Sequence, residues 1–115
     1  MDLNSRLLGL TTEIGTHVAY ERLSGEAVPF LLDVREPHEY VAGHIQAAVL
    51  IPLGQLAGRL AELPRDREIL CICRSGARSL SATRQLQAAG YRAVNLGGGM
   101  LAWSDAGLPV ARGQG

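Results

Sequence analysis

Short apolar runs alternate with segments of helical periodicity along this chain, and this alternation restricts the possible folds more than any other feature. The runs at residues 28–34 and 68–73 are largely apolar, which is typical of strands buried on both faces of a parallel sheet. Parallel strands that alternate with helices require right-handed crossover connections, and these place helices on both faces of the sheet. The sequence therefore predicts an α/β fold with a mainly parallel sheet.

Glycines, prolines and apolar spacing set the expected limits of each element. In the first helix, at residues 12–23, we expect Ile14, Val18 and Leu23 to face the core. The sequence contains no internal repeat and no linker, which favours one domain. Strands are expected at residues 8–10 (an edge strand), 28–34, 48–51, 68–73 and 93–96, and further helices at residues 36–43, 53–63, 79–89 and 100–105.

A cysteine joins the strand at residues 68–73 to the helix that follows it. Cys73 lies where backbone N–H groups and a helix dipole favour an anion, and Arg74 and Arg78 favour it further. The pKa of a thiol in such surroundings falls to about 3.5–7.5. A lone cysteine at a strand end is more often a small buried hydrophobic residue. The two arginines, the permissive Gly76 and the adjoining helix together favour a nucleophile instead.

The segment Cys73-Arg74-Ser75-Gly76-Ala77-Arg78-Ser79 resembles the active-site loop of the single-domain rhodanese family of sulfurtransferases. The resemblance covers about residues 9–110. It implies one compact α/β domain of about five strands at residues 9–110, with a lead-in segment at 1–8 and a C-terminal tail at 111–115. Four other segments resemble the family in the same order: Leu32-Asp33-Val34-Arg35, Gly43-His44-Ile45-Gln46-Ala47-Ala48, Ile51-Pro52, and Gly97-Gly98-Gly99 with Trp103 and Gly107-Leu108-Pro109-Val110.

The resemblance implies that the chain transfers sulfane sulfur. In this family a thiolate attacks a donor such as thiosulfate, holds the outer sulfur as a cysteine persulfide, and passes it to a nucleophilic acceptor. Cys73 matches the persulfide-forming residue. The acceptor could be cyanide, glutathione, thioredoxin or a sulfur-carrier protein, and the sequence does not separate a free enzyme from a persulfide carrier in a relay.

The rest of the loop is expected to bind the substrate. Backbone N–H groups from Arg74, Ser75, Gly76, Ala77 and Arg78 would surround the persulfide. The guanidinium groups of Arg74 and Arg78 would receive the sulfonate end of thiosulfate, because they are always charged and offer fixed donors. The alternative is that both arginines are solvated or form surface salt bridges. Ser75 stands where some thiosulfate-using members of the family have lysine.

Four residues outside the loop also match family positions. Asp33 and Arg35 could act as an acid and an anion ligand, but a hydrogen-bonded ion pair that fixes the strand end is favoured. His44 could act as a base toward Cys73, but a structural histidine satisfied by backbone partners is favoured. Trp103 is expected to belong to the core or to a pocket wall.

Two other functions can be weighed against sulfur transfer. Related domains use a cysteine loop to attack phosphate, and that chemistry needs a longer loop between the cysteine and the arginine. Only four residues separate Cys73 from Arg78, and the smaller loop suits a sulfur atom, so a phosphatase is the less favoured hypothesis. A non-catalytic interaction module is also less favoured, because the cysteine is intact.

Composition excludes several function classes. Eleven basic residues balance eleven acidic ones, which argues against nucleic acid or an anionic membrane as the main partner. The basic residues are all arginine, so Schiff-base chemistry on a lysine is excluded. Cys71 and Cys73 fit neither a disulfide framework nor a zinc site. We expect no metal, no cofactor and a soluble, cytoplasmic protein, because neither a signal peptide nor an apolar run of ~18 residues is present.

Overall fold

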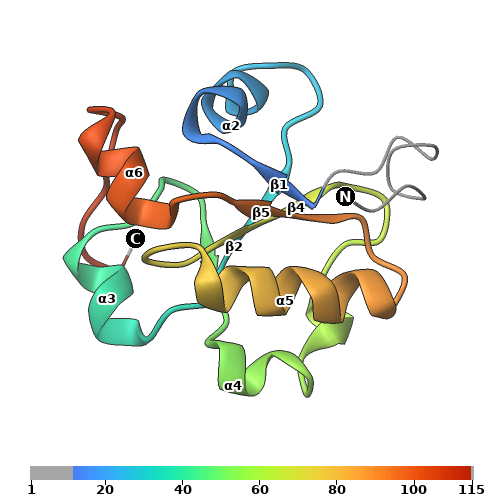
Figure 1. Cartoon of the computed structure of the whole chain (residues 1–115). Coiled ribbons are helices and arrows are strands. Elements are labelled where there is room, and N and C mark those ends of the chain that lie inside the picture. Colours follow the sequence, from blue (N-terminus) through green and yellow to red (C-terminus); the bar gives the residue numbers. More distant parts are fainter. Residues whose placement is uncertain (1–11, 115) are drawn as a thin grey trace.

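The computed structural model describes residues 12–114, which form one five-stranded sheet in the order β1-β5-β4-β2-β3 (Figure 1). Every pair of neighbouring strands is parallel. The predicted α/β fold with a parallel sheet is therefore confirmed. The strands are β1 (Glu13–Ile14), β2 (Phe30–Asp33), β3 (Val49–Leu50), β4 (Ile69–Ile72) and β5 (Ala93–Leu96).

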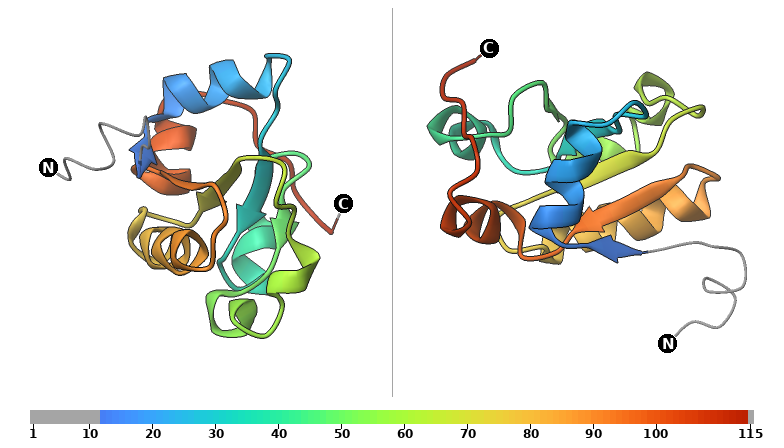
Figure 2. Two further views of the ribbon diagram at one scale, coloured as in Figure 1. Left: turned by 90° about the vertical axis from the view of Figure 1, so that its right-hand side faces the viewer. Right: turned by 90° about the horizontal axis from the view of Figure 1, so that it is seen from above.

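Helices cover both faces of the sheet, as right-handed crossovers require. Helices α2 and α6 lie over one face, and α4 and α5 lie over the other (Figures 1 and 2). No helix within residues 12–114 combines the length and the hydropathy needed to cross a bilayer. The helices are α2 (Thr16–Leu23), α3 (Pro37–Ala42), α4 (Leu53–Leu56), α5 (Ala77–Ala88) and α6 (Gly99–Asp105), with a 3-10 turn at Leu60–Glu62.

Strand β4 lies at the centre of the sheet and is buried along its whole length. Its side chains alternate between the two core layers, so that Cys71 packs on the α5 side and Ile72 on the α6 side. Because β2, β4 and β5 are parallel, their carboxyl ends meet at one edge of the sheet. Ligands bind at this edge in open α/β sheets, and Cys73 follows β4 there.

The first predicted helix is wrong at its start. Residues 13–14 form β1 and pair with the carboxyl half of β5, so α2 begins only at Thr16. Ile14 is buried as expected, but Val18 is 43% exposed and Ala19 is the fully buried residue of α2. Apolar spacing in so short a helix does not fix which side faces the sheet, and packing against α6 decides it.

The single helix predicted at residues 53–63 is also wrong. Helix α4 ends at Leu56, and i to i+3 hydrogen bonds then form a tighter turn, including one from the Gly58 N–H to the Gln55 carbonyl. Glycine lowers helix propensity by about 1 kcal/mol relative to alanine. Leu56 and Leu63 are both buried in the layer on the α5 side. Apolar residues of this segment are thus buried although its backbone is not one continuous helix.

Strand β5 has the predicted limits, and the limits of the other remaining elements differ from the predictions by at most two residues. Helix α5 begins at Ala77 rather than at residue 79, because the loop is shorter than expected. The edge strand predicted at residues 8–10 lies outside the described residues. Ala111 exchanges backbone hydrogen bonds with His44, and the Gly113 N–H donates to the Val41 carbonyl. The predicted domain limits, with a tail from residue 111, stay a prediction.

Candidate active site

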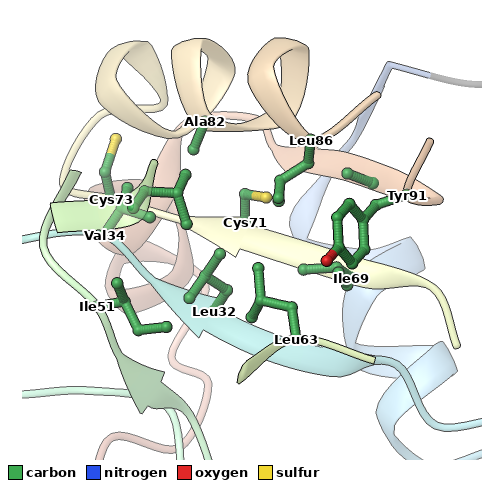
Figure 3. Close-up of a cluster of buried hydrophobic side chains, with 12 residues drawn as sticks. Leu32, Val34, Ile51, Leu63, Ile69, Cys71, Cys73, Ala82, Leu86 and Tyr91 are labelled. Atoms are coloured by element: carbon green, nitrogen blue, oxygen red, sulfur yellow. The ribbon is translucent and has the colours of Figure 1, made fainter. Parts of the chain in front are cut away.

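Cys73 stands directly after β4 and is joined to α5 by a short loop. Its sulfur accepts a hydrogen bond from the Gly76 N–H at 3.1 Å and lies 3.2 Å from the hydroxyl oxygen of Ser79. Figure 3 shows the sulfur beneath the first turn of α5. The side chain is only 1% exposed, but its neighbours Ser75 and Ala77 are exposed. The sulfur is therefore enclosed beneath a loop whose outer residues face solvent.

The surroundings of Cys73 favour its thiolate. Burial raises the pKa of the thiol, but hydrogen bonds from the side chain and backbone of Ser79, and from the backbone of Gly76 and Ser75, outweigh this effect. The pKa of Cys73 therefore lies below its usual value. Of the five predicted backbone donors, Gly76 and Ser75 act on the sulfur. The backbone and hydroxyl of Ser79 add donors that were assigned no role from the sequence.

Cys71 lies two residues earlier on the same face of the sheet (Figure 3). It is fully buried, and burial raises the pKa of its thiol to about 12, although a hydrogen bond from Thr83 lowers it and the charge of Cys73 raises it further. Both cysteines are free thiols. At neutral pH Cys71 stays protonated, so the two neighbouring cysteines have different chemistry.

Helix α6 is hydrogen-bonded to the backbone of the cysteine loop. The Met100 N–H donates to the Cys73 carbonyl at 2.8 Å, and the Leu101 N–H donates to the Arg74 carbonyl at 3.0 Å. Gly99 has φ +56°, and a Cβ at this position would lie 2.4 Å from the Cys73 oxygen. The glycine is needed because only a residue without a side chain lets the two backbones approach this closely.

The two loop arginines differ in their contacts. Arg78 binds Glu39 of α3 through two hydrogen bonds of 2.7 and 2.8 Å. These bonds lower the pKa of Glu39 to about 2, so the pair stays charged at neutral pH. Within residues 12–114 the exposed Arg74 side chain makes no hydrogen bond or ion pair, and it borders a groove of about 560 Å³ that Glu39, Met100 and Arg112 also line.

Known proteins are similar to this chain in both sequence and fold. The family model described as Rhodanese-like domain matches residues 16–106. The chain belongs to the rhodanese-like family. A sulfurtransferase from Allochromatium vinosum is 37% identical over 107 residues, which cover 92% of this chain and 100% of the relative. Thiosulfate sulfurtransferase 18 from Arabidopsis thaliana is 42% identical over 95 residues, covering 69% of each chain.

A solved rhodanese-related protein from Thermoplasma volcanium has the same fold, with a TM-score of 0.82 and 34% identity. The alignment covers 88% of this chain and 98% of that one. Membership of the rhodanese-like family and relatives named as sulfurtransferases support sulfur transfer as the general activity. The resemblance stated from the loop and its companion segments is thereby confirmed.

In this rhodanese-like domain, Asp33 and Arg35 form a buried ion pair at the end of β2. The Arg35 guanidinium donates to the two carboxylate oxygens of Asp33 at 2.9 and 2.7 Å. It also donates to the Gly43 carbonyl at 2.7 Å, which ties the strand end to the segment after α3. Such contacts are those expected if Asp33 and Arg35 form a hydrogen-bonded ion pair that fixes the strand end.

The other two matched residues lie in buried surroundings. His44 is fully buried, stacks on the Tyr40 ring and donates from Nδ1 to the Tyr40 carbonyl at 2.7 Å. No hydrogen bond joins it to Cys73 in the described part of the chain. Trp103 is buried and donates to the Pro109 carbonyl at 2.8 Å. It also borders an apolar cavity of about 520 Å³ on the α2 side, which the cysteine loop does not line.

Three residues of the site were given no role from the sequence, although Ser79 belongs to the quoted loop segment. Ser79 lies beside the sulfur, Glu39 binds Arg78, and Asn95 accepts a hydrogen bond from Ser79. Asn95 carried a signal, since it is a polar residue within a short apolar strand, and a buried amide needs partners. No group of three or more His, Cys, Asp or Glu side chains suited to a metal gathers within residues 12–114.

Proposed function

We propose that the chain is a thiosulfate-type sulfurtransferase that carries sulfur as a persulfide on Cys73. The observation behind this proposal is a sulfur with a lowered pKa, hydrogen-bonded by the Gly76 N–H beside the Ser79 hydroxyl. A thiolate that is already formed needs no general base, and the same donors stabilise a persulfide anion. The thiosulfate name of the Arabidopsis relative supports this donor.

The proposed reaction has two displacements. The Cys73 thiolate attacks the outer sulfur of thiosulfate, the sulfur–sulfur bond of the donor breaks, and sulfite leaves with the electron pair. Cyanide or a thiolate then attacks the outer sulfur of the persulfide, and Cys73 leaves as the thiolate. The acceptor in the cell would be a thiol, thioredoxin or a sulfur-carrier protein. The free thiols Cys71 and Cys73 support a reduced, cytoplasmic setting.

Mass spectrometry of the intact protein tests the proposal. Incubation with thiosulfate should add the mass of one sulfur atom, and cyanide should then remove it as thiocyanate. A protein that gains no sulfur, while its folded state is verified by circular dichroism, would contradict the assignment.

We assign the sulfonate end of thiosulfate chiefly to Arg74. Arg78 matches the predicted anion ligand by position, but its guanidinium is already bound by Glu39. Arg74 is exposed, and its backbone carbonyl is held by α6. The same Glu39 carboxylate argues against the phosphatase hypothesis, because it places a negative charge beside the arginine that a phosphate would need.

Replacing Arg74 by alanine should raise the KM for thiosulfate about fivefold, as expected for an exposed charged contact of about 1 kcal/mol. The effect should shrink as salt is added, because the contact is open to solvent. Arg84→Ala is the matched control, since Arg84 is an exposed arginine on α5 that lies beyond the loop. Equal KM values for the two variants, measured by thiocyanate formation, would remove Arg74 from donor binding.

A further inference from the structure

A buried amide stands behind the reactive sulfur. Asn95 of β5 is fully buried, and its Nδ2 lies 2.9 Å from a Glu13 carboxylate oxygen and 3.0 Å from the Gly76 carbonyl oxygen. Both partners can only accept hydrogen bonds, so the amide nitrogen must face them. The amide oxygen Oδ1 therefore faces Ser79, whose hydroxyl oxygen lies 2.5 Å away.

The Ser79 hydroxyl can donate one hydrogen bond, and two acceptors lie beside it: the Cys73 sulfur and the Asn95 amide oxygen. The Asn95 oxygen can only accept, and so can a thiolate or a persulfide anion at Cys73. With a neutral thiol, the S–H can donate to Ser79 while Ser79 donates to Asn95, and every group in the chain is satisfied. With an anionic sulfur, the Ser79 hydrogen must turn to the sulfur, and the buried Asn95 oxygen loses its donor.

We propose that Asn95 is a positioning residue that competes with the Cys73 sulfur for the single hydroxyl hydrogen of Ser79. The carboxylate of Glu13 and the carbonyl of Gly76 hold the amide in the orientation that makes this competition possible. An unpaired buried acceptor is costly, so Asn95 opposes part of the stabilisation that Ser79 gives to the anion.

The role that we give to this competition, tuning the nucleophile for sulfur transfer, rests on the proposed function. A thiolate with a very low pKa is a weaker nucleophile, and the best attacking thiol has a pKa near the ambient pH. Asn95 would keep the Cys73 thiolate populated but still reactive toward the donor sulfur. The persulfide is also an anion, and after sulfur transfer the hydroxyl hydrogen can return to Asn95 if the thiol is protonated.

Charged and titratable groups also stand on the elements around the loop, and none of them is substituted in the test. Arg78 on α5 interacts with the charge of Cys73. The others are Glu13 on β1, Asp33 and Arg35 at the end of β2, Glu39 on α3, Arg74 in the loop and the protonated Cys71 on β4.

The pH dependence of iodoacetamide alkylation measures the pKa of Cys73 directly. Cys71 should be alkylated slowly, because its thiol is buried and protonated, and it serves as an internal reference. Ser79→Ala should raise the pKa by about one unit or more, because the anion loses a hydroxyl donor. Asn95→Leu should lower it, because the Ser79 hydrogen then has only the sulfur to bind. In the double variant the lowering should vanish, since no hydroxyl remains to be redirected.

Thr83→Val is the matched control, because Thr83 is the next buried hydroxyl on the same face of α5 and donates to the Ser79 carbonyl. The control should leave the pKa of Cys73 near its wild-type value. A raised pKa in Asn95→Leu would show that Asn95 only supports the loop, and would overturn the proposal. If Asn95→Leu does not fold, Asn95→Ala removes the same acceptor and must also lower the pKa.

Alkylation needs no sulfur donor, so this experiment is independent of sulfur transfer. Opposite pKa shifts in a protein that takes up no sulfur would support the competition and contradict the proposed function. Sulfur loading without opposite pKa shifts in the Ser79 and Asn95 variants would support the proposed function and contradict the competition.

Discussion

Replacing Cys73 by serine should abolish the uptake of sulfur from thiosulfate, with a fall in loading rate of about a thousandfold or more. A serine hydroxyl is not ionised by the few hydrogen bonds that lower the pKa of the thiol, so no nucleophile remains. The fold should persist, because serine is close to cysteine in size and Ser79 and the Gly76 N–H can bind its oxygen. Mass spectrometry after thiosulfate treatment measures the loss.

Cys71→Ala provides the control for that result. Its thiol has a pKa of about 12 and is protonated at neutral pH, so its removal should leave sulfur loading largely intact. The cost should be limited to stability, about 1 kcal/mol for a small buried side chain. A folded Cys71→Ala variant that cannot load sulfur would show that Cys71 takes part, for example by resolving the persulfide.

Gly99→Ala should destabilise the domain by about 3 kcal/mol or more and disable sulfur loading with it. The added Cβ would lie 2.4 Å from the Cys73 carbonyl oxygen, at a backbone with φ +56°, so overpacking and backbone strain both oppose it. The loop and α6 would have to separate, which breaks the bond from the Met100 N–H to Cys73. Urea denaturation measures the free energy of unfolding.

Gly107→Ala separates the two causes. Gly107 also has a left-handed backbone, with φ +73°, but a Cβ there would meet no atom within 4 Å. Its alanine variant should lose only about 1 kcal/mol from backbone strain and should load sulfur normally. If Gly99→Ala were no worse than Gly107→Ala, the close contact between α6 and the cysteine loop would not matter.

Features that depend on neighbouring residues in the sequence could be predicted. The buried run through Cys71, the place of Cys73 directly after β4 and the short helix between Pro37 and Gly43 all follow from local composition and turn chemistry. The order of these segments then implied a parallel sheet whose carboxyl edge carries the loop. Local patterns suffice to predict the central strand because β4 is buried on both faces, so its sequence is a continuous apolar run.

Features that depend on distant partners could not be predicted. Glu39 lies in the first turn of α3, far from Arg78 in the sequence, and only the folded chain brings the two side chains together. Asn95 meets Ser79 because β5 lies beside β4 in the sheet. The start of α2 was wrong for the same reason: Glu13 and Ile14 pair with β5, and that pairing overrides helical spacing.

The near-complete enclosure of Cys73 also bears on how the chain behaves in air. A disulfide between two molecules requires their sulfur atoms to come within about 2 Å, with the two Cβ atoms about 4 Å apart. A side chain that is 1% exposed cannot reach a second copy of itself at that distance while its loop stays folded. We therefore expect non-reducing gels of the purified chain to show no disulfide-linked dimer after mild oxidation. The depth of the Cys73 sulfur in its loop thus opposes a disulfide between two copies of the chain.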